Sequence, residues 1–200
     1  TKIKEMLSLK KSLNILRKTD ALLEGHFVLS SGLHSPKYIQ CAKLLSFPSK
    51  AEKICKSLAS KIKKRFKKFD IILSPAMGGI IIGYEIGKLL KKETIFCERV
   101  NGKFVLRRGF KIKKGSKVLI IEDVITTGKS SLECLKLIKK SKASLVGFAA
   151  IIDRSSKKSL KIKKGIVSHL KINVPTYKKN KIPKNLKLIP ITTPGSRYIK

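Results

Sequence analysis

The stretch VLIIEDVITTGKSS at 118–131 holds the residues whose types and spacing are best suited to chemistry. An apolar strand is predicted to end at Glu122 and Asp123, the only two acidic residues that are adjacent in the chain. Ligands of open α/β sheets bind beyond the carboxyl ends of the strands. Two carboxylates at such a strand end are placed to accept hydrogen bonds from the hydroxyl groups of a sugar.

The turn that follows this acidic pair predicts a site for a phosphate group. It leads into a predicted helix over 129–142, and the free N–H groups and dipole of a helix N-terminus favour an anion. Gly128 lets the backbone approach closely, and the hydroxyl groups of Thr126, Thr127 and Ser130 add donors. The stretch therefore predicts a sugar-phosphate site, with an ordinary strand–turn–helix capped by Thr as the alternative.

Two other phosphate-binding motifs are absent from the sequence. Gly128-Lys129-Ser130 matches the end of the pattern GxxxxGK[ST], but position 123, where that pattern needs its first glycine, is Asp. No GxGxxG motif is present either. Neither a P-loop nor a dinucleotide-binding fingerprint is therefore expected.

The four cysteines, Cys41, Cys55, Cys97 and Cys134, offer no recognisable catalytic or metal-binding pattern. No two of them form a CxxC pair, and no spacing between Cys and His matches a zinc site. We expect reduced structural thiols in a cytosolic protein.

The composition excludes several classes of protein. Among the 200 residues, 47 basic and 12 acidic side chains give a net charge of +35, which suggests nucleic acid as a partner. However, 40 of the basic residues are Lys, spread along the chain without interleaved aromatics, so we prefer a solvated Lys-rich surface. The longest uncharged stretch, 71–84, is too short to span a membrane.

Apolar runs alternate with helical patterns through the middle of the chain. Buried strands are predicted over 70–74, 93–98, 117–123 and 144–153, and helices over 49–68, 80–91 and 129–142. Strands that are apolar on both faces and alternate with helices predict an α/β fold with a covered parallel sheet. The flanking predictions are a helix over 3–18, short strands within 26–42, a basic loop over 99–115 and a late strand over 166–174.

The 118–131 stretch resembles the phosphoribosyl pyrophosphate (PRPP) motif of type I phosphoribosyltransferases. Four further segments make the resemblance specific to the orotate phosphoribosyltransferase family: 25–45, 74–90, 98–110 and the PGSR at 194–197. The resemblance implies one domain over 1–200 with a central parallel sheet flanked by helices. Its core would span about 49–155, and a small hood would come from about 20–45 and 165–200.

The resemblance also implies the reaction and its partners. Ribose 5-phosphate would pass from PRPP to N1 of orotate, giving orotidine 5′-monophosphate and pyrophosphate, with Mg²⁺ as cofactor. We expect a cytoplasmic homodimer with shared active sites, no protein-only metal site, and neither a membrane nor a nucleic acid as partner.

The resemblance assigns roles to the strand ends. Glu122 and Asp123 would hold the ribose hydroxyls, and Asp123 would also balance positive charge on the ring. The substrate-binding residues that follow them are Val124, Ile125, Thr126, Thr127, Gly128, Lys129 and Ser130. The loop Ser74 to Gly79 would present backbone N–H groups to pyrophosphate through Ala76, Met77, Gly78 and Gly79.

Cationic and aromatic residues complete the implied site. Residues 99–109 match the mobile loop of the family, in which Arg99 and Lys103 would be the catalytic cations. The alternative is a solvated basic hairpin, which the concentration of Arg argues against. Arg107 and Arg108 are either pyrophosphate contacts or loop surface. Arg154 corresponds to the Arg that pairs with orotate, with a surface Arg as the alternative. Tyr38 either stacks near the orotate ring or belongs to the core.

This chain departs from the best-known family members at several positions. They have Lys where this chain has Ser30 and Gly78, and they carry Lys and His in a longer loop, where Val100 and Phe104-Val105 stand here. No Cys pair precedes the PGSR, so a metal is not expected there. These differences indicate a subgroup with a shorter loop and leave the division of labour among the loop cations open.

Two other functions compete with this one. A phosphoribosyltransferase for a purine or uracil would share the PRPP motif, but the hood segment and Arg154 favour an acidic pyrimidine. A nucleic-acid-binding regulator with the same fold would lack the catalytic loop and carry an added DNA-binding segment. Residues 1–25 contain no turn-separated helix pair, so we rank it lower.

Overall fold

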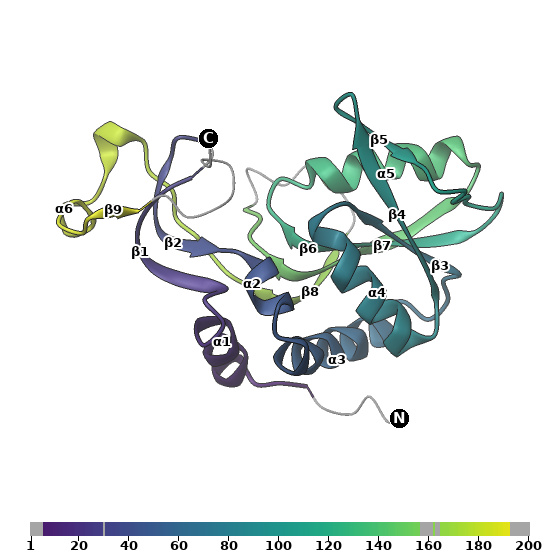
Figure 1. The fold of residues 1–200 in the computed structure, drawn as a ribbon, viewed down its shortest axis with the longest axis horizontal. Helices are drawn as coiled ribbons and strands as arrows, with labels where there is room; N and C mark the ends of the chain where they lie inside the picture. The colour runs from purple at the N-terminus through teal and green to yellow at the C-terminus, as the bar shows by residue number, and fades with distance from the viewer. Residues whose placement is uncertain (1–5, 30, 157–161, 163–164, 193–200) are drawn as a thin grey trace.

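The computed structural model describes residues 6–29, 31–156, 162 and 165–192. Its larger sheet has the strand order β5-β4-β3-β6-β7-β8 (Figure 1). The bounds of these strands are β3 Ile71–Pro75, β4 Glu93–Val100, β5 Lys103–Leu106, β6 Lys117–Ile125, β7 Ser144–Asp153 and β8 Ile166–Lys171. All neighbours pair in parallel except β5, which runs antiparallel to β4. The parallel sheet predicted from the apolar runs is thus confirmed.

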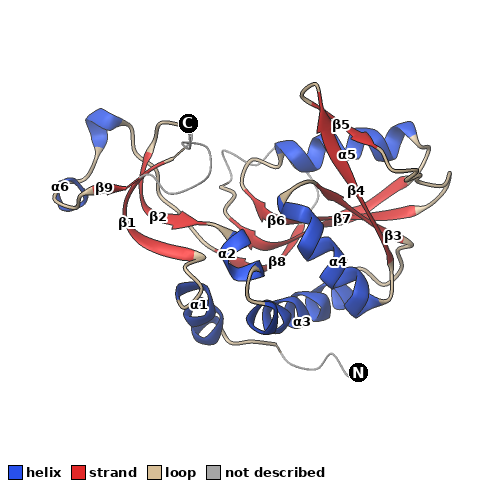
Figure 2. Ribbon diagram, in the orientation of Figure 1, coloured by secondary structure: helices blue, strands red, loops and turns tan. Residues whose placement is uncertain are grey.

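Helices cover both faces of this sheet (Figure 2). Helices α3 (Pro48–Arg65) and α4 (Gly78–Leu90) lie on one face, and α5 (Lys129–Lys140) lies on the other. Alternate side chains of β6 explain why the strand is apolar throughout: Leu119 packs into the α3/α4 core and Ile120 into the α5 core. Among the described residues, no helix combines the length and apolarity that a membrane crossing requires.

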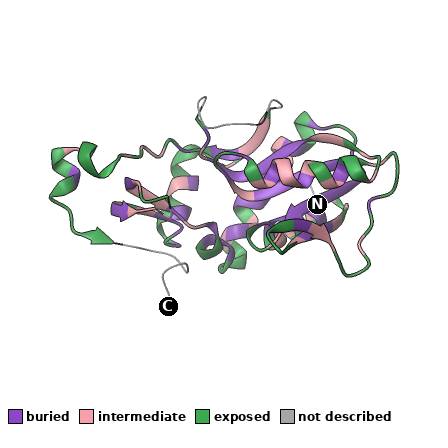
Figure 3. Ribbon diagram, turned by 90° about the horizontal axis from the view of Figure 1, so that it is seen from above, coloured by how far each residue is buried: buried purple, intermediate pink, exposed green. Residues whose placement is uncertain are grey.

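The central strands β3, β6 and β7 are buried along most of their length, whereas β4, β5 and β8 carry intermediate and exposed residues. Figure 3 shows the buried strands beneath helices whose outer turns are exposed. Fully buried side chains such as Ile72, Leu119 and Phe148 fill the space between the layers. Each contributes about 1.5–3 kcal/mol relative to an exposed side chain. This packing fixes where the carboxyl ends of β3, β4, β6 and β7 lie.

A row of glycines brings α4 close to the sheet. Gly79, Gly83 and Gly87 recur every four residues and therefore share one face of the helix. A β carbon at Gly83 would overlap Ser74 of β3, and one at Gly87 would overlap Thr94 of β4. The absence of side chains at these glycines lets the helix backbone rest on the strands. This contact fixes the N-terminus of α4 next to the carboxyl end of β3.

A smaller three-stranded sheet, which we call the hood, stands beside the core (Figure 1). Its strands are β2 (His34–Ile39), β1 (Leu22–Val28) and β9 (Ile191–Thr192), in that order. His26 Nε2 and His34 Nδ1 share a 2.7 Å hydrogen bond inside it, and His26 Nδ1 lies 3.1 Å from the Ile189 carbonyl oxygen. The contact of the buried His26 ring with the Ile189 backbone therefore joins the N-terminal and C-terminal parts of the hood.

The remaining elements connect the two sheets. Helix α1 (Leu9–Arg17) starts after Ser8, whose hydroxyl accepts a hydrogen bond from the Lys11 N–H, so it is shorter than the predicted 3–18. The short helix α2 (Cys41–Leu45), which was not predicted, follows β2. A 3-10 helix (Lys179–Lys181) and α6 (Lys184–Lys187) precede β9.

Two predictions need correction. Residues 99–115 were expected to form a loop, but β4 runs to Val100 and β5 follows a two-residue Asn101-Gly102 turn. Both turn residues have positive φ, 48° and 76°, the geometry that favours Asn-Gly in hairpins. The second hood segment was expected from about residue 165, but β8 pairs with β7 in the large sheet, and the pairing with the hood begins later, at Tyr177, which bridges His34, and at β9, which pairs with β1. Ser30 and the PGSR at 194–197 lie outside the described residues.

Candidate active site

The acidic pair sits at the carboxyl end of β6, with its two side chains on opposite faces of the sheet. Glu122 is buried on the α5 side, where its carboxylate accepts hydrogen bonds from the hydroxyl and the backbone N–H of Ser131. Burial raises the pKa of Glu122 to about 7, and the bonds from Ser131 oppose that shift. Ser131 was not among the predicted site residues, although it ends the 118–131 stretch.

Asp123 points to the α4 side of the sheet. Its Oδ1 accepts a hydrogen bond of 2.8 Å from the Val124 N–H, and burial raises its pKa above the usual value. The Sγ atom of Cys41 lies 3.8 Å from the Asp123 carbonyl oxygen. The first residue of α2 therefore contacts the backbone that carries the catalytic candidate, a contact not expected from the sequence.

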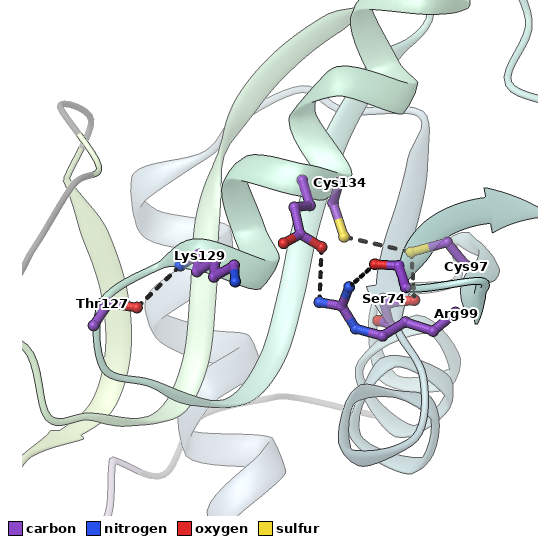
Figure 4. Close-up of polar contacts among 8 residues, drawn as sticks. Ser74, Cys97, Arg99, Thr127, Lys129 and Cys134 are labelled. Carbon is purple, nitrogen blue, oxygen red and sulfur yellow. Dashed lines mark hydrogen bonds and ion pairs between the residues drawn. The ribbon is translucent and has the colours of Figure 1, made fainter. Parts of the chain in front are cut away.

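The turn after β6 leaves the N-terminus of α5 open to an anion. Gly128 occupies the N-cap position in the left-handed region, φ 74°, and no acidic residue lies in the first turn of the helix. The Lys129 N–H donates to Thr127 Oγ1 over 3.3 Å (Figure 4). A β carbon at Gly128 would lie 2.6 Å from the Ile162 side chain, so the turn is covered on that side. The predicted residues Val124 to Ser130 thus surround one helix N-terminus.

The predicted pyrophosphate loop is shorter than expected. β3 includes Ser74 and ends at Pro75, and α4 begins at Gly78, so only Ala76 and Met77 lie between the two elements. The Ala76 N–H donates to the Cys97 carbonyl oxygen, 2.8 Å away, and ties the loop to β4. Gly78 and Gly79 therefore belong to the first turn of α4, where backbone N–H groups point toward the sheet edge.

Arg99 is held near the turn of the β4–β5 hairpin. Its guanidinium pairs with Glu133 of α5 at 2.7 Å and donates to the Gly102 carbonyl oxygen at 2.6 Å (Figure 4). It also lies 4.1 Å from the centre of the Phe104 ring. Pyrophosphate would have to displace Glu133 to take this guanidinium. Glu133 was not singled out in the sequence, because only the fold brings α5 to β4.

The other hairpin cations are arranged differently. Arg108 pairs with Glu98 at 2.7 Å and Arg107 lies 3.8 Å from the same carboxylate. Glu98 precedes Arg99 on β4, so its side chain lies on the opposite face of the hairpin. Lys103 is exposed at the start of β5, next to the hairpin turn.

Arg154 comes directly after β7 and lies beside the turn at the end of β6. Its backbone N–H donates to the Ile125 carbonyl oxygen over 2.8 Å. Burial lowers the pKa of its guanidinium, Tyr38 and Cys41 act on it electrostatically, and its buried Nε has no hydrogen-bond partner in the described part of the chain. A half-buried guanidinium with a free donor suits a planar carboxylate.

Tyr38 reaches this region from the hood. Its ring packs against that of Phe27 with centroids 5.8 Å apart, and the residue is half-buried on β2. The structure therefore brings Tyr38, Cys41 and Arg154 together where the hood meets the core. Cys41 is the member of this group that sequence reasoning treated only as a structural thiol.

Magnesium suits the carboxylates present. Within the residues that the structure describes, no group of three or more His, Cys, Asp or Glu side chains could hold a metal ion by itself. Mg²⁺ commonly takes one or two carboxylates and fills its remaining positions with phosphate oxygens and waters. Asp123 offers such an oxygen at the strand end, whereas Glu122 is engaged by Ser131.

The cysteines take no part in this site chemistry. All four are free and buried. Cys97 and Cys134 lie with their Sγ atoms 3.4 Å apart between β4 and α5 (Figure 4), and their mutual hydrogen bond and burial raise the pKa of Cys134. Protonated, buried thiols are poor nucleophiles.

Comparisons with known proteins concern nearly the whole chain. Residues 48–183 match the family model described as "Phosphoribosyl transferase domain". The chain is similar to the orotate phosphoribosyltransferase of Parvibaculum lavamentivorans, with 46% identity over 191 residues that cover 95% of this chain and 98% of that protein. It is also similar to the orotate phosphoribosyltransferase of Caldicellulosiruptor saccharolyticus, with 45% identity over 188 residues, 94% of this chain and 97% of that protein.

Solved structures share the fold. The crystal structure of orotate phosphoribosyltransferase from Aeropyrum pernix matches with a TM-score of 0.67 and 22% identity, over 80% of this chain and 92% of that one. The orotate phosphoribosyltransferase of Francisella tularensis matches with a TM-score of 0.59 and 26% identity, over 78% of this chain and 74% of that one. An adenine phosphoribosyltransferase from Saccharomyces cerevisiae, at 18% identity and a TM-score of 0.63 over 79% of this chain and 99% of that one, has the same fold.

Proposed function

The chain belongs to the orotate phosphoribosyltransferases, within the phosphoribosyl transferase domain family, and from that premise we propose how its residues divide the reaction. The reaction transfers ribose 5-phosphate from PRPP to N1 of orotate, giving orotidine 5′-monophosphate and pyrophosphate in pyrimidine (UMP) biosynthesis. The fold is that of type I phosphoribosyltransferases. We propose that residues 1–200 act as one domain.

The observation that carries the proposal is the meeting of three groups at neighbouring strand ends. The acidic pair ends β6, the open N-terminus of α5 follows it, and Arg154 at the end of β7 is bonded through its N–H to Ile125. We place the 5′-phosphate at the helix N-terminus, the ribose hydroxyls on Glu122 and Asp123, and the carboxylate of orotate on Arg154. The three protein groups thus lie in the same order as the phosphate, the ribose and the base that they would bind.

Catalysis then depends on position and charge. The bond from C1′ to pyrophosphate breaks as the bond from C1′ to N1 of orotate forms, and positive charge develops on the ribose ring in between. N1 loses its proton to solvent in this step. The buried carboxylate of Asp123 stabilises that charge more strongly than an exposed one would. Arg154 and Tyr38 hold the base in line for attack.

We propose Mg²⁺ as the cofactor, with Asp123 as the protein carboxylate closest to it. When bound, Mg²⁺ would neutralise the negative charge of the departing pyrophosphate. The first turn of α4 and the hairpin cation Lys103 would hold the same group from the protein side. A dialysed preparation titrated with MgCl₂ tests this cofactor, and full turnover in excess chelator would overturn it.

We also propose a homodimer that shares its active sites. Met77, Ile81 and Tyr84 expose apolar side chains along the outer face of α4, next to the pyrophosphate loop. A second copy that covers this face would bring its hairpin toward the site, so that Lys103 of one subunit serves the other. Sedimentation of the native protein and of Ile81→Asp tests the interface; a native monomer would contradict it.

We place the enzyme in the cytoplasm, which suits its four free thiols. The decisive assay for the function follows the loss of orotate absorbance with PRPP and Mg²⁺. Turnover with orotate and none with adenine, hypoxanthine or uracil is expected. Turnover with another base instead would replace the assignment, and tight, salt-dependent binding of RNA without turnover would favour the regulator.

A further inference from the structure

Gly78 and the Asp123 carboxylate approach each other too closely for any side chain at position 78. A β carbon built on Gly78 would lie 2.6 Å from Asp123 Oδ2, 2.8 Å from its Cγ and 2.9 Å from its Oδ1. All three distances are shorter than real contacts of a β carbon. The backbone of Gly78 does not have a positive φ, so a larger residue is excluded by the carboxylate and not by backbone strain.

One oxygen of the Asp123 carboxylate, Oδ1, accepts a hydrogen bond from the Val124 N–H. The carboxylate lies against the first turn of α4, whose glycine row rests on β3. A methyl group at position 78 would therefore push the carboxylate off its backbone bond.

We propose that Gly78 is a positioning residue: its bare α carbon lets the Asp123 carboxylate lie against the first turn of α4, joining the ribose-binding strand to the pyrophosphate loop. The inference rests on the proposed role of Asp123 and adds a residue that acts through it.

Thermal unfolding of Gly78→Ala in three backgrounds tests the contact without relying on activity. In the native protein, the methyl group meets the carboxylate, and we expect the melting temperature to fall by about 5 °C. In Asp123→Asn, whose side chain has the same size, a similar fall is expected. In Asp123→Ala the space is open, and alanine should raise the melting temperature by about 1–3 °C because it restricts the unfolded chain.

The proposal requires that the change in melting temperature caused by Gly78→Ala is negative with Asp or Asn at position 123 and positive with Ala there. Equal falls in all three backgrounds would overturn it, because the cost would then come from some other neighbour of position 78. Should Gly78→Ala alone fail to fold, the double variant with Asp123→Ala must still fold, and its failure would also overturn the proposal. Gly165→Ala is the matched control, since a β carbon there meets nothing within 4 Å.

Steady-state kinetics test the positioning role. Gly78→Ala should lower kcat at least tenfold and leave the KM for orotate within twofold, because Arg154 and Tyr38 are not disturbed. An unchanged kcat together with the reversed melting shift would show a contact without a positioning role and would overturn that part of the proposal. If Asp123→Asn itself kept full turnover, the proposed function of the strand end would fail instead.

Discussion

The acidic end of β6 and the basic β4–β5 hairpin lie at the same end of the large sheet, where the parallel strands terminate. Their charged side chains differ in burial and in partners. Glu122 and Asp123 are largely buried and bonded to groups within their own strand, turn and helix. The hairpin cations are exposed or paired with carboxylates, Arg99 with Glu133 and Arg108 with Glu98.

The end of β6 is therefore already formed before substrate binds, whereas the arginines of the hairpin must exchange partners to bind an anion. The Asp123 carboxylate is held by the Val124 N–H before a ribose arrives, so its contribution to lowering the barrier is prepared in advance. The guanidinium groups of Arg99 and Arg108 are paired with protein carboxylates and must exchange these partners for the substrate anion.

Asp123→Asn should have the largest effect on turnover. The amide keeps the size of the carboxylate but removes the charge that stabilises the ribose ring, so kcat should fall about 10²–10³-fold. Initial rates with saturating PRPP and orotate measure this, with circular dichroism to establish that the fold is retained. An activity within a few-fold of the native protein would remove Asp123 from the catalytic residues.

Lys103→Ala should lower kcat by about 10- to 100-fold, since it removes the exposed cation nearest the hairpin turn. Mixed dimers test whose site it serves. With Lys103→Ala in one subunit and Asp123→Asn in the other, only one of the two sites keeps both native residues if sites are shared, whereas none does if each subunit uses its own lysine. No recovery of activity on mixing would contradict the shared site.

Glu122→Gln should change how stability depends on pH. The native carboxyl, with a pKa of about 7, holds a proton between pH 4.5 and 7 that the unfolded chain has lost, so stability falls as pH rises through that window. Glutamine does not titrate, so the variant does not lose this stability. Between pH 5 and pH 8 its free energy of unfolding should rise by a few kcal/mol relative to that of the native protein.

Urea unfolding at several pH values measures that difference. His169, whose pKa burial lowers to about 4, gives an opposite slope, stability rising between pH 4 and 6.5, but it is present in both proteins and cancels. Parallel curves for the two proteins would show that Glu122 is ionised throughout.

Glu133→Gln should have a smaller effect, and it should strengthen the binding of PRPP where damage to the site would weaken it. Weakening the bond to Arg99 frees the guanidinium, so the KM for PRPP should fall about two- to fivefold while the KM for orotate stays the same. Glu98→Gln is the control on the other face of the hairpin. A rise in the KM for PRPP would mean that Glu133 orients Arg99 for the substrate and does not compete with it.

Arg108→Ala should have the smallest effect. Arg108 is exposed in its ion pair with Glu98, and ion pairs at the surface contribute about 0–1 kcal/mol. We expect a melting temperature within about 3 °C of the native value and turnover within twofold. A tenfold loss of kcat would assign Arg108 to pyrophosphate binding and leave Glu98 as its resting partner.

The end of β6 could be predicted from the sequence, whereas the contacts between separate elements could not. The acidic pair, the turn and the start of α5 are contiguous, so strand, turn and helix patterns located them together. The contacts of Ser131 with Glu122, Glu133 with Arg99 and Gly78 with Asp123 depend on how separate elements pack, which no local pattern encodes. The hairpin is an exception, since Asn101-Gly102 is a local sequence that favours a two-residue hairpin turn.

The pairing of β1 with β9 has a consequence for synthesis of the protein. Every strand of the large sheet is synthesised before residues 191–192, whereas the partner of His26 and Phe27 is made 165 residues after them. The large sheet therefore does not need β9, and the hood sheet is complete only after β9 has been made. A nascent chain stalled within that last stretch would carry the carboxylates in place and still lack the completed wall that faces the base.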